Sequence, residues 1–545
     1  MRDETEAPAP AARQPKLKPA NENPWYVLMT LYGEQEGEEI DRDLQVENRR
    51  VWNIWASGQA SHSKREELTS LGISSPPRDQ WLRKSAEIRA LFTEEFQRRN
   101  PGAEVDVGEL DKPSEIDLSR LEFRRPLELS GYLFPADLTI SFSSFYGKCS
   151  IQEAGFAGRL SAKLCSFGEG LDASYSVFLG DVNFDSSSVE QSTGRFQFAE
   201  VKFKKRASFA RCFLRGYSDF SHASFEDDAN FEDCKFQAGV DFNMSAFSKD
   251  VYGRYLWGHD GFDFGRVVVR GTLDLSEASF CGNTSFKNAH FEKTVSLRMS
   301  KFEDNADFSF SVFDNFSFFS GTIFGSGVAE GTKSLDFSGA TFAKPSNFTS
   351  AFFLSAFPDW EGAILHEKFS FTADERNWPV EYINDTVVAR ESCATIRHIL
   401  AKQGLPEDEH FFFRREMHFA GRIGSIWQRL PYLLFGLFSE YGYSILRPTL
   451  WLLGIWALGF AAFWGYLSGC CVPAPDSVIE RPMGAAMALS FSNLFPLFGF
   501  GRTFLSDVLG VLPPVLQFFS GVQTVASLPL LFFLGLGLRQ RFRLR

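Results

Sequence analysis

The chain of 545 residues is longer than a single domain usually is, so several domains are expected. Its composition has one outlier, 60 Phe against 13 Tyr and 11 Trp, which indicates one structural position that the same side chain fills repeatedly. The net charge of −12 gives no reason to expect nucleic-acid binding, because phosphate recognition needs a basic surface.

The first 115 residues divide into a tail and a small folded region. Residues 1–22 are polar, rich in Pro and Ala, and hold no apolar stretch of the kind found in a signal peptide. We therefore expect a disordered tail that stays in the cytoplasm. Residues 23–115 hold several large aromatic residues and a predicted helix at Lys84–Arg98. They predict an α-rich cap that covers the first coil of the next domain and shields its edge from other chains.

A Phe residue recurs every 11 positions through the middle of the chain, with short interruptions. A second apolar series lies five residues before each of these positions, and a small side chain lies two residues before each of them. Neither a helical nor a strand period gives this alternation of 5 and 6, so we expect a narrow solenoid whose stacked coils bury the rings. The predicted core residues are Phe145, Phe156, Phe167, Phe178, Phe225, Phe236, Phe247, Phe280, Phe291, Phe302, Phe313, Phe324 and Phe342.

Segments such as "NFEDCKFQAGVDF" (Asn230–Phe242) and "DFSGATFAKPSNF" (Asp336–Phe348) show the pattern most clearly. They resemble the pentapeptide-repeat family, in particular its branch with F-x-G-A-x-F units. The resemblance implies a mainly β fold over residues 116–375, a right-handed quadrilateral β-helix with about two 11-residue units per turn. Where the period lapses we expect loops to bulge out, at residues 191–195, 251–263 and 325–333.

The sequence gives no sign of catalytic or metal-binding chemistry. No CxxC pair or Cys/His cluster with zinc spacing occurs, nor does any GxxxxGK[ST], GxSxG or HExxH motif. Cys165, Cys212 and Cys234 fall on the small inward position, so we expect packed core thiols. We predict no enzyme activity, no cofactor and no metal. A basic segment at Lys202–Arg215 is either a chance surface feature or a docking patch for an acidic partner or lipid headgroups.

The pattern becomes helical after the repeats. Residues 380–446 predict a helical connector, and residues 447–545 predict two transmembrane helices with an intervening segment. The uncharged stretches Pro448–Val472 and Val508–Leu538 are each long enough to cross a bilayer. Arginines precede the first stretch and follow the second, which places both termini in the cytoplasm. This combination resembles bacterial proteins in which a pentapeptide β-helix precedes two spans, and it implies a multi-pass protein of the bacterial inner membrane.

The segment at residues 483–502 follows the order of a pore domain: a short helix, a Gly-aromatic-Gly loop, and then the second span. This order resembles the two-transmembrane potassium channels, whose filter carbonyls replace the water shell of the ion. Arg502 at the pore mouth would repel cations, so we do not expect strict potassium selectivity. The alternatives are a re-entrant hairpin that packs an oligomer, and a plain loop. The filter positions implied by the resemblance are Leu497, Phe498, Gly499, Phe500 and Gly501.

Three functions compete on this basis. The first is an oligomeric ion channel, a tetramer if it forms a pore, with the β-helix as a cytoplasmic module. The second is a membrane-tethered scaffold whose β-helix binds a cytoplasmic protein partner without conductance. A third draws on soluble relatives that mimic duplex DNA, and the basic segment and the membrane helices disfavour it. We therefore expect membrane lipid and a homo-oligomeric partner, and we do not expect nucleic acid.

Overall fold

The computed structural model describes residues 17–37, 39–104, 107–111, 113–327, 334–379, 385–469, 481–496 and 505–541. Two compact units make up the chain. The solenoid unit comprises Met1–Asn384 with Ile399–Gly404, and the helical unit comprises Asp385–His398 with Leu405–Arg545. Each is considered separately.

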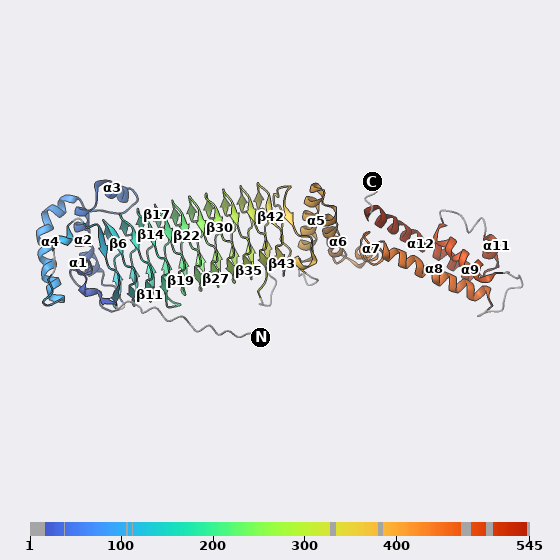
Figure 1. The fold of residues 1–545 in the computed structure, drawn as a ribbon, viewed down its shortest axis with the longest axis horizontal. Coiled ribbons are helices and arrows are strands. Elements are labelled where there is room, and N and C mark those ends of the chain that lie inside the picture. Colours follow the sequence, from blue (N-terminus) through green and yellow to red (C-terminus); the bar gives the residue numbers. More distant parts are fainter. Residues whose placement is uncertain are drawn as a thin grey trace, which may run out of the picture. The chain divides into compact units, whose positions relative to one another are not determined.

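The solenoid is a parallel β-solenoid of about 11 turns, with its short strands stacked in four columns (Figure 1). The first column holds β1 (Lys18–Pro19), β3 (Leu121–Phe123), β7 (Ser144–Phe145), β11 (Ser166–Phe167), β15 (Ser188–Val189), β19 (Phe213–Leu214), β23 (Lys235–Phe236), β27 (Trp257–Gly258), β31 (Ser279–Phe280), β35 (Lys301–Phe302), β39 (Ile323–Phe324) and β43 (Phe352–Phe353). The second holds β2 (Glu115–Asp117), β6 (Asp137–Thr139), β10 (Leu160–Ser161), β14 (Val182–Asn183), β18 (Ala207–Ser208), β22 (Ala229–Asn230), β26 (Val251–Tyr252), β30 (Leu273–Asp274), β34 (Val295–Ser296), β38 (Ser317–Phe318), β42 (Ser346–Phe348) and β44 (Ser370–Phe371).

The other two columns complete each coil. The third holds β4 (Leu127–Glu128), β8 (Cys149–Ser150), β12 (Gly170–Asp172), β16 (Arg195–Gln197), β20 (Ser218–Asp219), β24 (Val240–Asp241), β28 (Phe262–Asp263), β32 (Thr284–Ser285), β36 (Ala306–Asp307) and β40 (Leu335–Asp336). The fourth holds β5 (Leu133–Phe134), β9 (Gly155–Phe156), β13 (Val177–Phe178), β17 (Lys202–Phe203), β21 (Ser224–Phe225), β25 (Ala246–Phe247), β29 (Val268–Val269), β33 (His290–Phe291), β37 (Val312–Phe313) and β41 (Thr341–Phe342). The predicted solenoid with four sides per coil is therefore confirmed, and its handedness stays a prediction.

The register shows where coils are longer than the basic repeat. Phe203 pairs with Phe225, and Phe225 with Phe247, so the common coil contains two of the predicted repeat units. Phe178 pairs with Phe203, and this coil is three residues longer than the common one because of the interruption predicted at residues 191–195. Phe313 pairs with Phe342 in a coil that is seven residues longer, and the added residues coincide with the interruption predicted at residues 325–333.

The interruption predicted at residues 251–263 is wrong. Gly258 pairs with Phe236 on one side and with Phe280 on the other, at the same separation as in the common coil. Gly258 occupies a position that a ring fills elsewhere, and the buried Leu256 occupies the neighbouring small position. The large and small side chains have exchanged places, which preserves the volume inside the coil.

The interior is filled by stacked rings and by small polar groups that bond to the backbone. Phe225 stacks on Phe203 and Phe247, with ring centroids 4.7 and 4.6 Å apart. In the small positions, Ser176 Oγ donates to the carbonyl of Ile151 at 2.6 Å, and other buried Ser, Thr and Cys side chains bond to the backbone in the same way. Buried polar groups need such partners, so the small positions accept hydroxyls and thiols.

Four α-helices lie at the N-terminal end of the solenoid (Figure 1): α1 (Pro24–Met29), α2 (Arg42–Gln59), α3 (His62–Ser70) and α4 (Arg78–Arg99). Short 3-10 turns η1 (Ala20–Glu22), η2 (Val107–Leu110) and η3 (Glu375–Asn377) flank the coils. Trp52 packs on Phe134 and donates its Nε1 proton to the carbonyl of Leu133 at 2.8 Å. The strand β1 pairs in parallel with β3, so structure begins inside the segment expected to be a disordered tail.

The helical unit consists of α-helices. Most of α5 (Thr386–Gln403) belongs to this unit, followed by α6 (Pro406–Ala420), α7 (Ile426–Ser439), α8 (Leu446–Leu467), α9 (Pro482–Leu494), α11 (Ser506–Val511) and α12 (Pro514–Arg541). Among the described residues, α8 and α12 are the two helices long and apolar enough to cross a membrane. Only 22% of the most apolar window of each is buried, whereas the core helix of a soluble protein is mostly buried.

Candidate functional site

The positions predicted from the sequence fall into two groups. The filter positions Leu497–Gly501 and the mouth residue Arg502 lie outside the described residues. The 13 predicted core Phe residues are all buried inside the solenoid, with at most 3% of each side chain exposed. The described part of the pore-like segment is α9, which lies close to the expected short helix and precedes the predicted filter by two residues.

The helix α9 packs against both apolar helices of the unit (Figure 1). Ala486 and Leu489 of α9 form a cluster with Phe463 and Leu467 of α8. Leu494, at the end of α9, packs with Leu452 of α8 and Leu530 of α12. Three helices of this part of the chain, α8, α9 and α12, are therefore packed together.

A layer of polar side chains is buried between these three helices. Gln523 of α12 donates to Ser490 Oγ at 2.7 Å and to the carbonyl of Ile455 at 3.2 Å, and it accepts from Asn493 Nδ2 at 3.0 Å. Asn493 Nδ2 also donates to Ser520 Oγ at 2.8 Å, and Ser490 Oγ donates to the carbonyl of Trp456 at 2.8 Å. Only 2% of Gln523 is exposed. We name Ser490, Asn493, Ser520, Gln523 and Ser527 the polar layer.

Gly459 of α8 allows the polar layer to form. A Cβ atom at residue 459 would lie 2.5 Å from Gln523 Nε2 and 2.6 Å from Ser490 Oγ, closer than real Cβ contacts. Gly454 and Gly465, on the same helix, have no atom within 4 Å of an added Cβ. Small residues at an interface between membrane helices let their backbones approach closely. Gly459 has this role in α8.

The helical unit buries the polar layer between its apolar clusters and leaves many large apolar side chains exposed. The buried face of α12 carries Ser520, Gln523 and Ser527, and its exposed residues include Phe518 and Phe532. A soluble bundle has the opposite arrangement, because water drives apolar side chains inward. By length and composition α8 and α12 could cross a membrane, and the exposed apolar side chains of α12 fit that placement. Polar residues inside membrane helices commonly mark functional positions.

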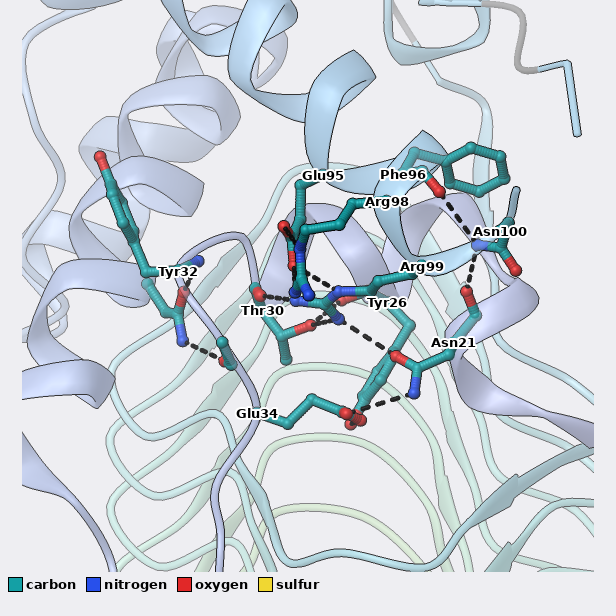
Figure 2. Close-up of polar contacts among 12 residues, drawn as sticks. Asn21, Tyr26, Thr30, Tyr32, Glu34, Glu95, Phe96, Arg98, Arg99 and Asn100 are labelled. Carbon is teal, nitrogen blue, oxygen red and sulfur yellow. Dashed lines mark hydrogen bonds and ion pairs between the residues drawn. The ribbon is translucent and has the colours of Figure 1, made fainter. Parts of the chain in front are cut away.

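A second polar cluster lies in the cap of the solenoid unit (Figure 2). Arg99 of α4 has only 6% of its side chain exposed; its Nε bonds to Glu95 at 2.6 Å and its Nη1 donates to Thr30 Oγ1 at 2.8 Å. Figure 2 also shows Tyr26 of α1, whose hydroxyl donates to Glu34 at 2.7 Å. The Tyr26 ring packs edge-on against Phe123 of the first coil, with centroids 5.5 Å apart. The cluster therefore ties α1 and α4 together above the first coil.

Electrostatics in the cap follow from these contacts. Hydrogen bonds from Arg98 and then from Arg99 lower the pKa of the Glu95 carboxyl, although partial burial opposes this. Burial, followed by the neighbouring Glu34, raises the pKa of the Tyr26 phenol far above its usual range. Both groups therefore keep one charge state over the physiological pH range, which suits a structural role.

The described residues offer no metal centre. No group of three or more His, Cys, Asp or Glu side chains in that part of the chain is placed to hold a metal ion. A cleft of about 560 Å³ beside the cap cluster is lined by Glu34, Glu36 and Asp41 and also by Arg98 and Arg125. Because both signs of charge line the cleft, it favours no one class of charged ligand. The basic segment is partly compensated as well, since Lys204 pairs with Glu226 at 2.6 Å.

The polar layer was not predicted from the sequence, because only the loop at residues 497–502 was considered as a functional site. The available signal was the presence of Gln523, Asn493 and several serines in otherwise apolar helices. Comparison of the chain with models of protein families, with curated proteins and with solved structures found no match. The pentapeptide-repeat and pore-loop resemblances therefore stay predictions, while the solenoid and the two apolar helices stand on the geometry of the chain itself.

Proposed function

We propose that this chain is a non-enzymatic protein of a bacterial inner membrane, in which the helical unit is the pore-like domain of a homo-oligomeric channel. In this proposal the solenoid is a rigid cytoplasmic module, and ion selectivity is weak. The observation that carries the proposal is the packing of α9 between α8 and α12 through the buried polar layer. In the sequence, Gly499, Phe500 and Gly501 follow this packed short helix, as the filter follows the pore helix in the channels that the sequence resembles.

The surface of α9 supports association between copies. Met483, Met487 and Phe491 recur every four residues and are exposed, on a helix whose buried face packs against α8 and α12. Heterologous contacts between identical chains close into rings when the rotation between them closes. A fourfold ring would bring four loops at residues 497–502 around one axis, as in the channels that the sequence resembles.

The test measures oligomer mass and conductance on the full-length protein. We expect the mass of a tetramer for the detergent-solubilised protein and discrete conductance steps in planar bilayers. Gly499→Val and Gly501→Val should abolish or alter the steps, because valine resists the backbone conformations that bring successive carbonyls into a pore. Gly454→Val is the matched control, since its Cβ would meet open space on α8. Silent bilayers formed with a well-folded tetramer would refute conductance.

A membrane-tethered scaffold is the second candidate, and one observation favours it. The polar layer is satisfied within a single chain: Ser490, Asn493 and Gln523 all find hydrogen-bond partners there. The layer therefore needs neither a neighbouring copy nor an ion. Under this proposal the protein is monomeric in detergent, and the full chain recovers one defined cytoplasmic protein through the solenoid surface. Exchange of surface residues on the coils, such as Tyr175→Ala, would weaken that recovery without affecting membrane attachment.

A further inference from the structure

The helix α7 carries an exposed apolar stripe that no described part of the chain covers. Trp427 and Ile426 have 80% and 73% of their surface exposed, and the other members are exposed as well. At 100° per residue the stripe occupies an arc of about 120° on one side of the helix. We name this set the α7 stripe: Ile426, Trp427, Leu430, Leu433, Leu434 and Leu437.

The remaining face of α7 holds the helix against the apolar helices. Phe435 packs against Phe533 of α12 with ring centroids 5.4 Å apart, and Phe438 packs against Trp451 of α8 at 5.2 Å. Arg447 at the start of α8 donates to the carbonyl of Gly436 at 3.2 Å. The α7 stripe therefore points away from the bundle while the helix itself is fixed in place.

These contacts also set the depth of α7. Phe533 precedes Arg539, the first charged residue after the apolar part of α12, by six residues, or about 9 Å along the helix. Trp451 follows Arg447 by four residues, or about 6 Å. Figure 1 shows α7 beside the start of α8 and the end of α12. The helix thus lies at the level where both spans leave the apolar core of a bilayer.

We propose that α7 lies along the membrane surface with the α7 stripe in the boundary between lipid headgroups and acyl chains. The inference rests on the membrane attachment in the proposed function and is independent of conductance. The occupant is lipid because Leu446 and Leu450 are exposed too, in the first turns of α8, the part of that helix that contacts α7 through Arg447 and Trp451. Arg429, Arg539 and Arg541 provide positive charge near this end of the two spans, which suits anionic headgroups, whereas Arg447 is paired with Glu440 at 3.6 Å. A tryptophan at the stripe also matches the preference of that ring for the membrane interface.

Spin labels on the full-length protein in lipid nanodiscs test this placement. Cys281, Cys470 and Cys471 are first replaced by serine, since the other cysteines are buried in the described structure. Labels are then introduced one at a time by Trp427→Cys and Leu430→Cys on the stripe, and by Gln428→Cys as a matched exposed position on the same helix. Trp464→Cys on α8 is the control for a lipid-facing span, and Tyr175→Cys on the solenoid is the control for water.

The measurement compares relaxation by oxygen, which concentrates in lipid, with relaxation by a water-soluble nickel chelate. We expect oxygen to dominate at residues 427, 430 and 464, and the chelate to dominate at residues 428 and 175. Chelate dominance at 427 and 430 with oxygen dominance at 464 would overturn the placement of α7 and leave membrane attachment intact. Protection of 427 and 430 from both reagents would overturn it in favour of a second copy of the chain. Chelate dominance at 464 would refute the proposed function itself.

Discussion

Substitution of Gly459 by alanine should loosen the contact of α8 with α9 and α12. The added Cβ would lie 2.5 Å from Gln523 Nε2 and 2.6 Å from Ser490 Oγ, whereas ordinary contact distances are about 3.5 Å. Either these two side chains or the backbone of α8 must therefore move by about 1 Å. Gln523 is flexible but buried, so it can swing aside only by giving up its bonds to Ser490, Ile455 and Asn493.

The size of the effect follows from those bonds. Hydrogen bonds between membrane helices contribute about 0.6 kcal/mol each on average, so three lost bonds cost about 2 kcal/mol. If the helices separate instead, overpacking costs about 1–3 kcal/mol. Alanine also favours the helix over glycine by about 1 kcal/mol, but Gly454→Ala and Gly465→Ala share this gain. We therefore expect Gly459→Ala to be less stable than these two controls by about 2–3 kcal/mol.

Amide hydrogen exchange of the full-length protein in detergent measures this difference locally. A loss of about 2–3 kcal/mol increases exchange in α9 by roughly 30- to 150-fold, if the helix opens on its own. The double variant Gly459→Ala/Gln523→Ala should cost less than the sum of its parts, because the obstructing amide is gone. Equal exchange in all three glycine variants, or strict additivity in the double variant, would refute the reasoning.

Three further predictions concern the solenoid unit. Phe225→Ala removes a ring stacked on both sides and should cost about 3–5 kcal/mol, seen as faster amide exchange in the adjacent coils, while Phe310→Ala, at an exposed corner, should change little. Burial raises the pKa of Cys165 to about 12, so its thiol should resist alkylation at neutral pH; because unfolded thiols ionise near pH 8.5, stability should fall as the pH rises above that value. Alkylation of Cys165 in the native protein at the rate found for an unfolded peptide would contradict this prediction. The lowered pKa of Glu95 contributes stability above about pH 4.3 that is lost as the pH falls through the folded pKa. In Glu95→Gln, amide exchange in the cap, corrected for the intrinsic exchange rate, should therefore increase less as the pH falls through this range.

The solenoid could be predicted because its period is a direct consequence of burial. An inward ring at so regular an interval has few structural explanations, and the pairing of Phe203 with Phe225 matches two repeat units in each coil. The prediction failed at residues 251–263 because it followed the identity of one position. Gly258 and Leu256 conserve the volume of the coil while breaking the pattern of residue types. Strand β1 was missed for a different reason, since two residues that pair with a distant edge leave no local pattern.

The lengths of the two apolar helices could be predicted from the sequence, but which face of each helix is buried could not. Hydropathy identified both candidate spans, because about 20 apolar residues are needed to cross a bilayer. It gave no sign that Gln523 and Ser490 meet across helices, since that contact depends on how α9 turns against α12. The helix α7 was absorbed into the predicted connector because its stripe of leucines has the same spacing as the buried face of a soluble helix. Only its exposure distinguishes the two cases.

The two units also differ in which side chains they expose. In the solenoid unit the stacked Phe rings are inside and the charges are outside, as water requires. In the helical unit Gln523 and Asn493 are inside, whereas Phe518, Phe532 and the α7 stripe are outside. The described surfaces of the two units therefore differ in character, and in the helical unit most exposed large apolar side chains lie from α7 onward. A soluble bundle with the sequence of α8 and α12 would have to bury the outer face of α12 and expose Gln523, which the polar layer opposes. The membrane proposal thus depends less on hydropathy than on the burial of the polar side chains of α12 and the exposure of its apolar ones.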